Sequence, residues 1–298
     1  MSGTYNLFGD SKLKNSIGYA YSDKDPESSY IRYPGELFKK DGTVPSFRIT
    51  HWWTNFPIED FTPQNLSEGV WKTSTNGINV ILEEGDEFNT ITLDILGKNE
   101  YGEKVRKDGG GFPHLLLEQF FGDSPSIGQL KSFNFNCDLK IEKVINYMNK
   151  KDYDPLYHTA QTSAIFAIEN RNKESDSYGE YFWFGVPVYD DRVEIPLAYT
   201  NRDGGKLSDE KIGTGMFIYT IDGKYFWDKS VLDNSWHSIN KNLLPFIHKA
   251  FTCAQESGYL KGAVISDMHF KSFNFGWEIT GTYDAAIKLR NIRGDYSI

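Results

Sequence analysis

Apolar and polar residues alternate along most of the chain, and this pattern predicts β-strands. Successive side chains of a strand point to opposite faces, so alternation marks a strand with one buried face. The densest stretch is 181–192, an aromatic strand that ends in a charged turn, followed by an apolar run over 193–199. The other predicted strands are 46–53, 78–82, 90–96, 113–121, 130–141, 162–170, 215–221, 224–227, 262–275 and 277–292.

Only one stretch has the spacing of a convincing helix. Leu243, Leu244, Ile247, Phe251 and Ala254 recur at steps of three and four residues. Asn240 can cap this helix at its start, and Gly258 can end it. Strands and helices do not alternate, so the pattern favours an all-β fold, an antiparallel sandwich of two sheets of the jelly-roll type with one short amphipathic helix.

The chain has no Pro-, Ser- or Gly-rich linker that would divide it. We therefore predict one β-sandwich domain over residues 44–298. Residues 1–43 are polar, with scattered tyrosines, and are expected to form an N-terminal arm packed on the domain.

Charge and cysteine content exclude several classes of protein. The net charge is −9, which indicates a soluble chain and disfavours nucleic acid and anionic membranes. No apolar run of about 18 residues predicts a membrane-spanning helix. Cys137 lies in a predicted strand and Cys253 in the predicted helix, so we expect two free thiols, although one bridge stays open. The first residues are not a secretory signal, so we expect a cytoplasmic protein, or a secreted or periplasmic one whose signal was removed.

Aromatic residues make up 15% of the chain, more than a core requires, so some rings are expected on the surface. Sugar rings stack on Trp and Tyr while their hydroxyls bond to polar side chains. Aromatic residues next to polar groups are therefore candidates for glycan contact, and for each the alternative is a place in the core. The candidates are Trp52, Trp53, Trp183, Tyr189, Trp236, His237 and Trp277.

Cleavage of a glycan would require two carboxyl groups about 5–10 Å apart. Glu118 lies inside an apolar strand, where burial should raise its pKa as suits a general acid; the alternative is a buried Glu paired with an Arg or Lys, for example Arg192. His114 shares its face of the strand and is expected to form a polar cluster with it. Glu278 and Asp190 are the other carboxyl candidates, and a lyase would instead use His114, Tyr189, Arg192 and His237.

Cofactors are not expected. The histidines show neither HxH nor HExxH spacing, and the chain has no nucleotide-binding fingerprint. A structural calcium ion is left open, at Asp190-Asp191 or at Asp284 with backbone carbonyls.

The strands 112–121, 161–188 and 262–292, with the late run Gly276-Trp277-Glu278-Ile279, resemble the concanavalin A-like lectin and glucanase group of jelly rolls. The resemblance covers most of residues 44–294 and is architectural. The glucanase signature Glu-x-Asp-x-x-Glu is absent, so no catalytic pair is carried over. The resemblance implies a protein that binds or cleaves a glycan on a concave sheet.

Three hypotheses follow. The first is a carbohydrate-binding sandwich that uses aromatic and polar side chains of one sheet. The second is a glycan-cleaving enzyme, either a glycoside hydrolase or a polysaccharide lyase. The third is a structural or assembly sandwich whose aromatic residues make subunit contacts. An oligosaccharide or polysaccharide is the expected partner; the sequence leaves the glycan, its linkage and the oligomeric state open.

Overall fold

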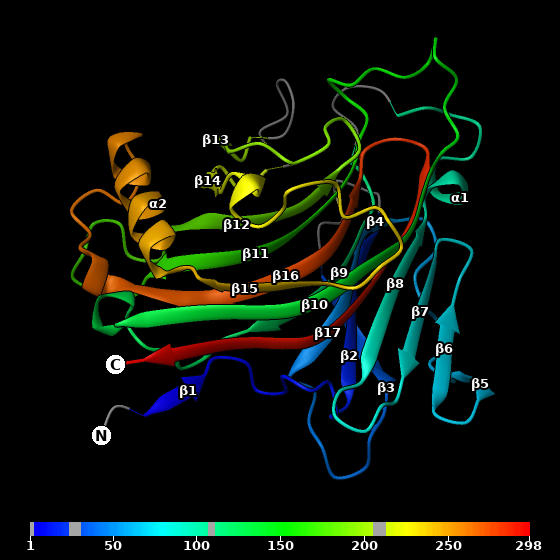
Figure 1. Cartoon of the computed structure of the whole chain (residues 1–298), viewed down its shortest axis with the longest axis horizontal. Helices are drawn as coiled ribbons and strands as arrows, with labels where there is room; N and C mark the ends of the chain where they lie inside the picture. The colour runs from blue at the N-terminus through cyan, green and yellow to red at the C-terminus, as the bar shows by residue number, and fades with distance from the viewer. Residues whose placement is uncertain (1–2, 24–30, 107–110, 205–212) are drawn as a thin grey trace.

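Two β-sheets pack face to face in the computed structural model, which describes residues 3–23, 31–106, 111–204 and 213–298 (Figure 1). Within these residues the smaller sheet has eight strands in the order β15-β10-β17-β8-β7-β6-β5, with β1 paired to β17. The larger sheet has nine strands in the order β13-β14-β12-β11-β16-β9-β4-β2-β3. The predicted all-β two-sheet sandwich is confirmed.

The smaller sheet comprises β1 (Thr4–Asn6), β5 (Gln64–Ser67), β6 (Val70–Ser74), β7 (Ile78–Glu83), β8 (Thr90–Leu96), β10 (Ser132–Asn146), β15 (His237–Asn242) and β17 (Tyr283–Ser297). The larger sheet comprises β2 (Ile17–Asp23), β3 (Arg32–Phe38), β4 (Phe47–Thr54), β9 (His114–Phe120), β11 (Ala160–Asn170), β12 (Tyr181–Asp190), β13 (Tyr199–Arg202), β14 (Phe217–Thr220) and β16 (Met268–Ile279). The helical elements are α1 (Gly97–Tyr101), α2 (Leu244–Glu256), η2 (Ile127–Gln129), η3 (Gly223–Tyr225) and η4 (Ile265–Asp267). Pairing is antiparallel except between β12 and β14 and between β2 and β4.

The core is a cluster of phenylalanines from both sheets. Phe133 and Phe135 of β10 meet Phe166 of β11 and Phe270 and Phe273 of β16, and all five are fully buried. Ring centroids lie 4.5 Å apart for Phe133 and Phe270 and 5.0 Å apart for Phe166 and Phe273. Each buried ring contributes about 2–3 kcal/mol of transfer free energy. These contacts hold the large sheet on the small one and leave its other face outward.

Helix α2 lies at one side of the sandwich, near β10, β12 and β14 (Figure 1). The predicted apolar positions 244, 247, 251 and 254 are buried. The N-cap position is Leu243, and the side-chain oxygen of the preceding Asn242 accepts from the Leu244 N–H at 3.2 Å; the predicted cap Asn240 lies within β15. Gly258 follows the helix with a φ of 89°, as a glycine at a helix end can.

Several sequence expectations differ from the fold. Residues 17–23 and 32–38, expected in an arm, form β2 and β3 of the large sheet, with β2 between β3 and β4. The sequence predicted that one strand ends at 275 and the next begins at 277, but both positions lie inside β16. A Cβ on Gly276 would lie 2.1 Å from the Leu115 carbonyl oxygen, so this glycine permits close pairing of β16 with β9. The aromatic run 224–227 enters the short helix η3 instead of a strand.

Both cysteines are free, as predicted. Cys137 is buried in β10 and Cys253 is partly buried in α2. Burial raises the pKa of the Cys137 thiol. Among the helices that the structure describes, none has the length and apolar character needed to cross a membrane.

Candidate functional site

Five side chains stand in one line across the outer face of the large sheet. Trp52 of β4 lies opposite His114 of β9, which lies opposite Glu278 of β16. Glu278 lies opposite Gln161 of β11, which lies opposite Asp190 of β12. Directly opposed residues of antiparallel strands point to the same face. All five are partly exposed, and we call them the polar row.

His114 is held in one tautomer. Its Nδ1 lies 2.9 Å from the Phe112 carbonyl oxygen, which can only accept, so Nδ1 carries the proton. The Phe112 ring stacks on the imidazole with centroids 4.4 Å apart. Burial lowers the pKa of His114 and outweighs the opposing effect of Glu278. The ring is therefore neutral at neutral pH, and its Nε2 is an acceptor that faces Glu278 Oε1 at 4.0 Å.

Gln161 orients Glu278 from the next strand. Its Nε2 donates to Glu278 Oε2 at 2.7 Å, and the side chain of Glu278 is 25% exposed. A carboxylate can only accept, so the amide nitrogen must face it and the amide oxygen of Gln161 stays an acceptor. Gln161 was not among the residues expected from sequence. A polar residue in an alternating strand indicates an outward-facing side chain, which could have marked Gln161 as a candidate. The residues that lie opposite it on neighbouring strands could not be identified from the sequence.

Asp190 ends β12 in an ion pair with Arg192. Arg192 Nε donates to Asp190 Oδ1 at 2.8 Å, and the Arg192 backbone N–H donates to the same oxygen at 3.0 Å. Burial alone would raise the pKa of Asp190, but the bonds from Arg192 outweigh it and lower the pKa. Asp191 fixes the adjoining turn, because it accepts from the Thr159 hydroxyl, the Ala160 N–H and the Tyr283 hydroxyl.

Trp53 follows Trp52 at the end of the polar row, and it breaks the alternation of buried and exposed side chains along β4. Its φ of 57° is unusual for an aromatic residue and allows both Trp52 and Trp53 to stay partly exposed. Gly111 lies against the Trp53 indole, and a Cβ there would come within 2.1 Å of the ring. The glycine therefore lets the chain before β9 approach the indole closely, while residues 107–110 lie outside the described residues.

Glu118 is paired with an arginine, as the alternative interpretation expected, but the partner is Arg48 and not Arg192. Arg48 Nε and NH2 lie 2.7 Å and 2.6 Å from Glu118 Oε2. Burial raises the pKa of Glu118, and the guanidinium opposes this without cancelling it. Four residues of β9, about 13 Å, separate Glu118 from His114, so the expected polar cluster of the two does not form.

The other predicted aromatic residues do not gather at the polar row. Trp277 is fully buried, and Tyr189 is 9% exposed and packs edge-to-face on it at 6.3 Å, so both belong to the core. Trp183 is partly exposed on the outer face of β12, and its Nε1 donates to the Thr214 hydroxyl at 3.2 Å. Trp183 lies opposite position 167 of β11. Position 167 is six residues along β11 from Gln161 of the polar row, so Trp183 is about 20 Å from the row.

Trp236 and His237 lie on the small sheet. The Arg290 guanidinium stacks on the Trp236 ring at 4.1 Å, and His237 Nε2 bonds to Asp233 at 2.8 Å. The structure therefore separates these two residues from the polar row. The predicted lyase set is also not brought together, because it needs His237 and the core residue Tyr189 beside His114.

Acidic residues do not converge on a metal site. Among the residues that the structure describes, no group of three or more His, Cys, Asp or Glu side chains could hold a metal ion. Asp190 is bound by Arg192, and Asp284 accepts from the Lys98 N–H and the Tyr147 hydroxyl, each at 3.1 Å. The structural calcium ion stays a prediction.

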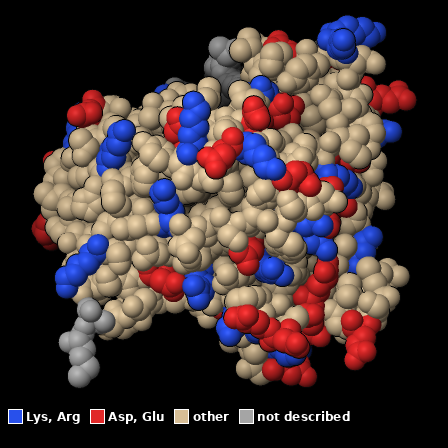
Figure 2. Space-filling view, viewed as in Figure 1, with Lys and Arg blue, Asp and Glu red and all other residues tan. Residues whose placement is uncertain are grey.

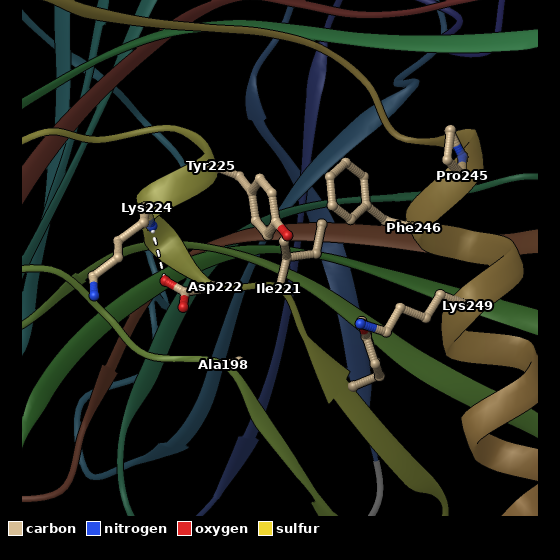
Figure 3. Close-up of a pocket in the computed structure, with 9 residues that line it drawn as sticks. Ala198, Ile221, Asp222, Lys224, Tyr225, Pro245, Phe246 and Lys249 are labelled. Carbon is tan, nitrogen blue, oxygen red and sulfur yellow. Dashed lines mark hydrogen bonds between the residues drawn. The ribbon is translucent and has the colours of Figure 1, made fainter.

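A pocket of about 620 Å³ lies apart from the predicted residues, between β14, η3 and α2 (Figure 3). Tyr225 and Phe246 face each other there, with ring centroids 4.9 Å apart, and Lys249 reaches in from the helix. It is lined by Ala198, Tyr219, Ile221, Asp222, Lys224, Tyr225, Pro245, Phe246 and Lys249. Asp222 accepts from the backbone N–H of Lys224 at 3.0 Å, so it caps η3. The lining holds no second carboxyl group, and we assign it no reaction.

Comparisons with known proteins give little beyond the architecture. A scan against models of protein families finds no match, and no curated protein matches the sequence. Solved structures that resemble the chain include a family 12 xyloglucanase from Bacillus licheniformis. It shares 12% identity and a TM-score of 0.43, over 81% of this chain and 99% of that one.

Two further structures are of the same kind. Endoglucanase 3 of Trichoderma harzianum, from family GH12, shares 10% identity and a TM-score of 0.39, over 86% of this chain and 100% of that one. The family 11 xylanase from Neocallimastix patriciarum shares 9% identity and a TM-score of 0.36, over 78% and 94%. These proteins are of the glucanase kind that the architectural resemblance named. With TM-scores below 0.5, the likenesses carry no argument about the activity of this chain.

Proposed function

We propose that this protein recognises a glycan on the outer face of its large sheet, at the polar row. The observation that supports the proposal is the register itself. Five different strands place an indole, an imidazole, two carboxylates and an amide in one line, all partly exposed. A sugar chain needs a flat apolar surface for its C–H faces and polar groups for its hydroxyls, and the row offers both.

Cleavage of the bound glycan is a second candidate function, favoured by the spacing of two carboxylates. Glu278 and Asp190 share the face with one strand between them, so their Cα atoms are about 9.6 Å apart. An inverting hydrolase uses carboxyl groups about 6.5–9.5 Å apart, and side chains on Cα atoms at this spacing can bring their carboxyl groups into that range. Asp190, kept ionised by Arg192, would be the base that activates water, and the protonated form of Glu278 would be the acid.

The pair of Glu118 and Glu278 does not suit this reaction. Glu118 lies opposite Asn274, four residues along β16 from Glu278, which is about 13 Å. The Arg48 guanidinium also covers Glu118, stacked near the rings of Tyr33 and Phe120 at 4.7 Å and 4.5 Å. A substrate on this face would meet Arg48 before it met Glu118.

A glycan array with a polysaccharide pull-down tests the proposal, with new reducing ends and absorbance at about 235 nm for unsaturated products measured on the same panel. Binding that weakens in Trp52→Ala and persists in Trp236→Ala supports recognition at the polar row. Reducing ends that disappear in both Glu278→Gln and Asp190→Asn support hydrolysis. Neither binding nor product across the panel would sink the glycan proposal and favour an assembly role.

A further inference from the structure

The centre of the polar row is a group of hydrogen-bond acceptors, and it points to one class of sugar. Resting on the proposed function, we propose that the row is selective for glycans that carry free primary amines, that is, amino sugars without an N-acetyl group. The residues that would hold the ammonium group are His114, Glu278 and Gln161.

Two acceptors, His114 Nε2 and Glu278 Oε1, face each other at a distance that leaves room for one donor atom between them. His114 Nε2 and Glu278 Oε1 are 4.0 Å apart, beyond the length of a direct hydrogen bond. Because Nδ1 of His114 donates to the Phe112 carbonyl, Nε2 offers its lone pair. An atom about 2.9 Å from both would have to donate twice. A sugar hydroxyl has one proton to donate, whereas a primary ammonium has three.

Gln161 adds a third acceptor beside this pair. Its Nε2 is used by Glu278 Oε2 at 2.7 Å, which leaves the amide oxygen to accept. Three acceptors from three neighbouring strands match the three N–H bonds of an ammonium group. An N-acetylated nitrogen has one N–H and a bulky acyl group, so it satisfies only one of them.

Charge favours the same ligand. In the described part of the chain, Glu278 forms an ion-pair contact only with His114, which is neutral. Three other carboxylates of this face are each matched by a cation: Glu118 by Arg48, Glu169 by Lys271 and Arg171, and Asp190 by Arg192. An ammonium group would supply the missing countercharge, and the net charge of −9 attracts a polycationic glycan over a longer range.

Acidity should switch this selectivity. The charged and titratable groups that act on His114 are Glu278, Asp203 and His51. Protonation of His114 puts a proton on Nε2, which removes the acceptor lone pair and places a positive charge 4.0 Å from Glu278 Oε1. Binding of the amino sugar should therefore fall in acid as His114 protonates and fall in alkali as the amine loses its proton.

Calorimetric titration with three matched oligosaccharides tests the proposal. Oligomers of glucosamine, N-acetylglucosamine and glucose, with one linkage and one length, are compared near neutral pH. Charge-assisted hydrogen bonds of this kind predict about 10- to 100-fold tighter binding of the glucosamine oligomer. Equal affinity for the three would overturn the selectivity while leaving glycan recognition intact, whereas no binding of any glycan on the panel would overturn the proposed function.

Variants then locate the selectivity. Glu278→Gln removes the charge and should bring the glucosamine oligomer to within about threefold of the glucose oligomer. Glu83→Gln, on the small sheet, removes the same charge elsewhere and should keep the preference. Unfolding curves of both variants verify that each is folded. A preference that survives Glu278→Gln would contradict the proposal.

Discussion

The outer faces of both sheets carry ion pairs, but the large sheet also carries a row of acceptors around one carboxylate, Glu278. On the small sheet, Lys288 contacts Glu83 and Glu142, Lys143 lies 2.9 Å from Asp94, and Arg290 lies 3.4 Å from Asp138. Figure 2 shows both signs of charge interspersed over the side of the molecule that it views. On the large sheet, the polar row combines an indole with acceptors and leaves Glu278 without a lysine or arginine partner among the described residues.

Under the proposed function, this difference would separate a solvated face from a binding face. Paired charges on an exposed sheet keep the surface wet and contribute little to stability. Acceptors in register, with one carboxylate unmatched by a cation among the described residues, are groups that a donor ligand would satisfy. Substitutions on the outer face of the large sheet should therefore change either the free energy of unfolding or the affinity for glycan. Substitutions on the outer face of the small sheet should have only small effects on both.

Arg48→Ala should have the largest effect. It leaves the buried carboxylate of Glu118 without its countercharge and should lower the free energy of unfolding by about 3 kcal/mol. The pKa of Glu118, already raised by burial, should rise further. The folded state then binds protons more tightly than the unfolded state, so the loss should be smaller at about pH 5 than at about pH 8.

Urea unfolding at both pH values measures this effect. Arg293→Ala serves as the control, since Arg293 is 44% exposed and lies 3.3 Å from Asp295 on the small sheet. A loss for Arg48→Ala no greater than that of the control would show that the Glu118 pair is as dispensable as a surface pair.

Trp52→Ala should have the next largest effect, on binding. Removal of a central aromatic anchor should weaken glycan affinity by about 30-fold, or about 2 kcal/mol. Trp236→Ala removes an exposed indole from the side of the small sheet and should change affinity less than about twofold. Titration calorimetry with a glycan found on the array measures both. Equal losses in the two variants would contradict a site confined to the large sheet.

Arg192→Gln should lower the free energy of unfolding by about 1 kcal/mol at neutral pH. This loss is smaller than for a fully buried ion pair because the Arg192 side chain is 29% exposed. The Asp190 pKa is lowered in the folded state, so the pair stabilises the fold above the unfolded pKa of about 4 and loses this effect in acid. Unfolding curves of the variant and the parent should therefore converge as the pH falls. A gap that stays constant with pH would mean that Arg192 acts through packing.

Lys143→Ala should have the smallest effect. Lys143 and Asp94 have side chains 33% and 15% exposed, and their pair should contribute less than about 1 kcal/mol. The contribution should vanish at about 1 M salt, where charges are screened within about 3 Å. Thermal unfolding at low and high salt measures it. A larger loss that persists in high salt would show that the small sheet depends on its charge pairs.

The sequence by itself determined most strands and the face on which each side chain lies. The alternation over 162–170 and 130–141 requires one face of each strand to be buried, and β11 and β10 follow it. The same alternation put His114 and Glu118 on one face of their strand, and they lie opposite Trp52 and Arg48 of β4. Alternation is a local property of the backbone, so it can be read without knowing the neighbouring strands.

Only the tertiary structure decided which of these residues meet. Trp52, His114, Gln161, Asp190 and Glu278 come from strands far apart in the chain, and their alignment depends on the order and register of five strands. The same strand order places Arg48 of β4 opposite Glu118. It also places β15, which follows Trp236, in the other sheet. Register is set by packing of the phenylalanine core and by close approaches such as Gly276 on Leu115, and no local pattern encodes these long-range contacts.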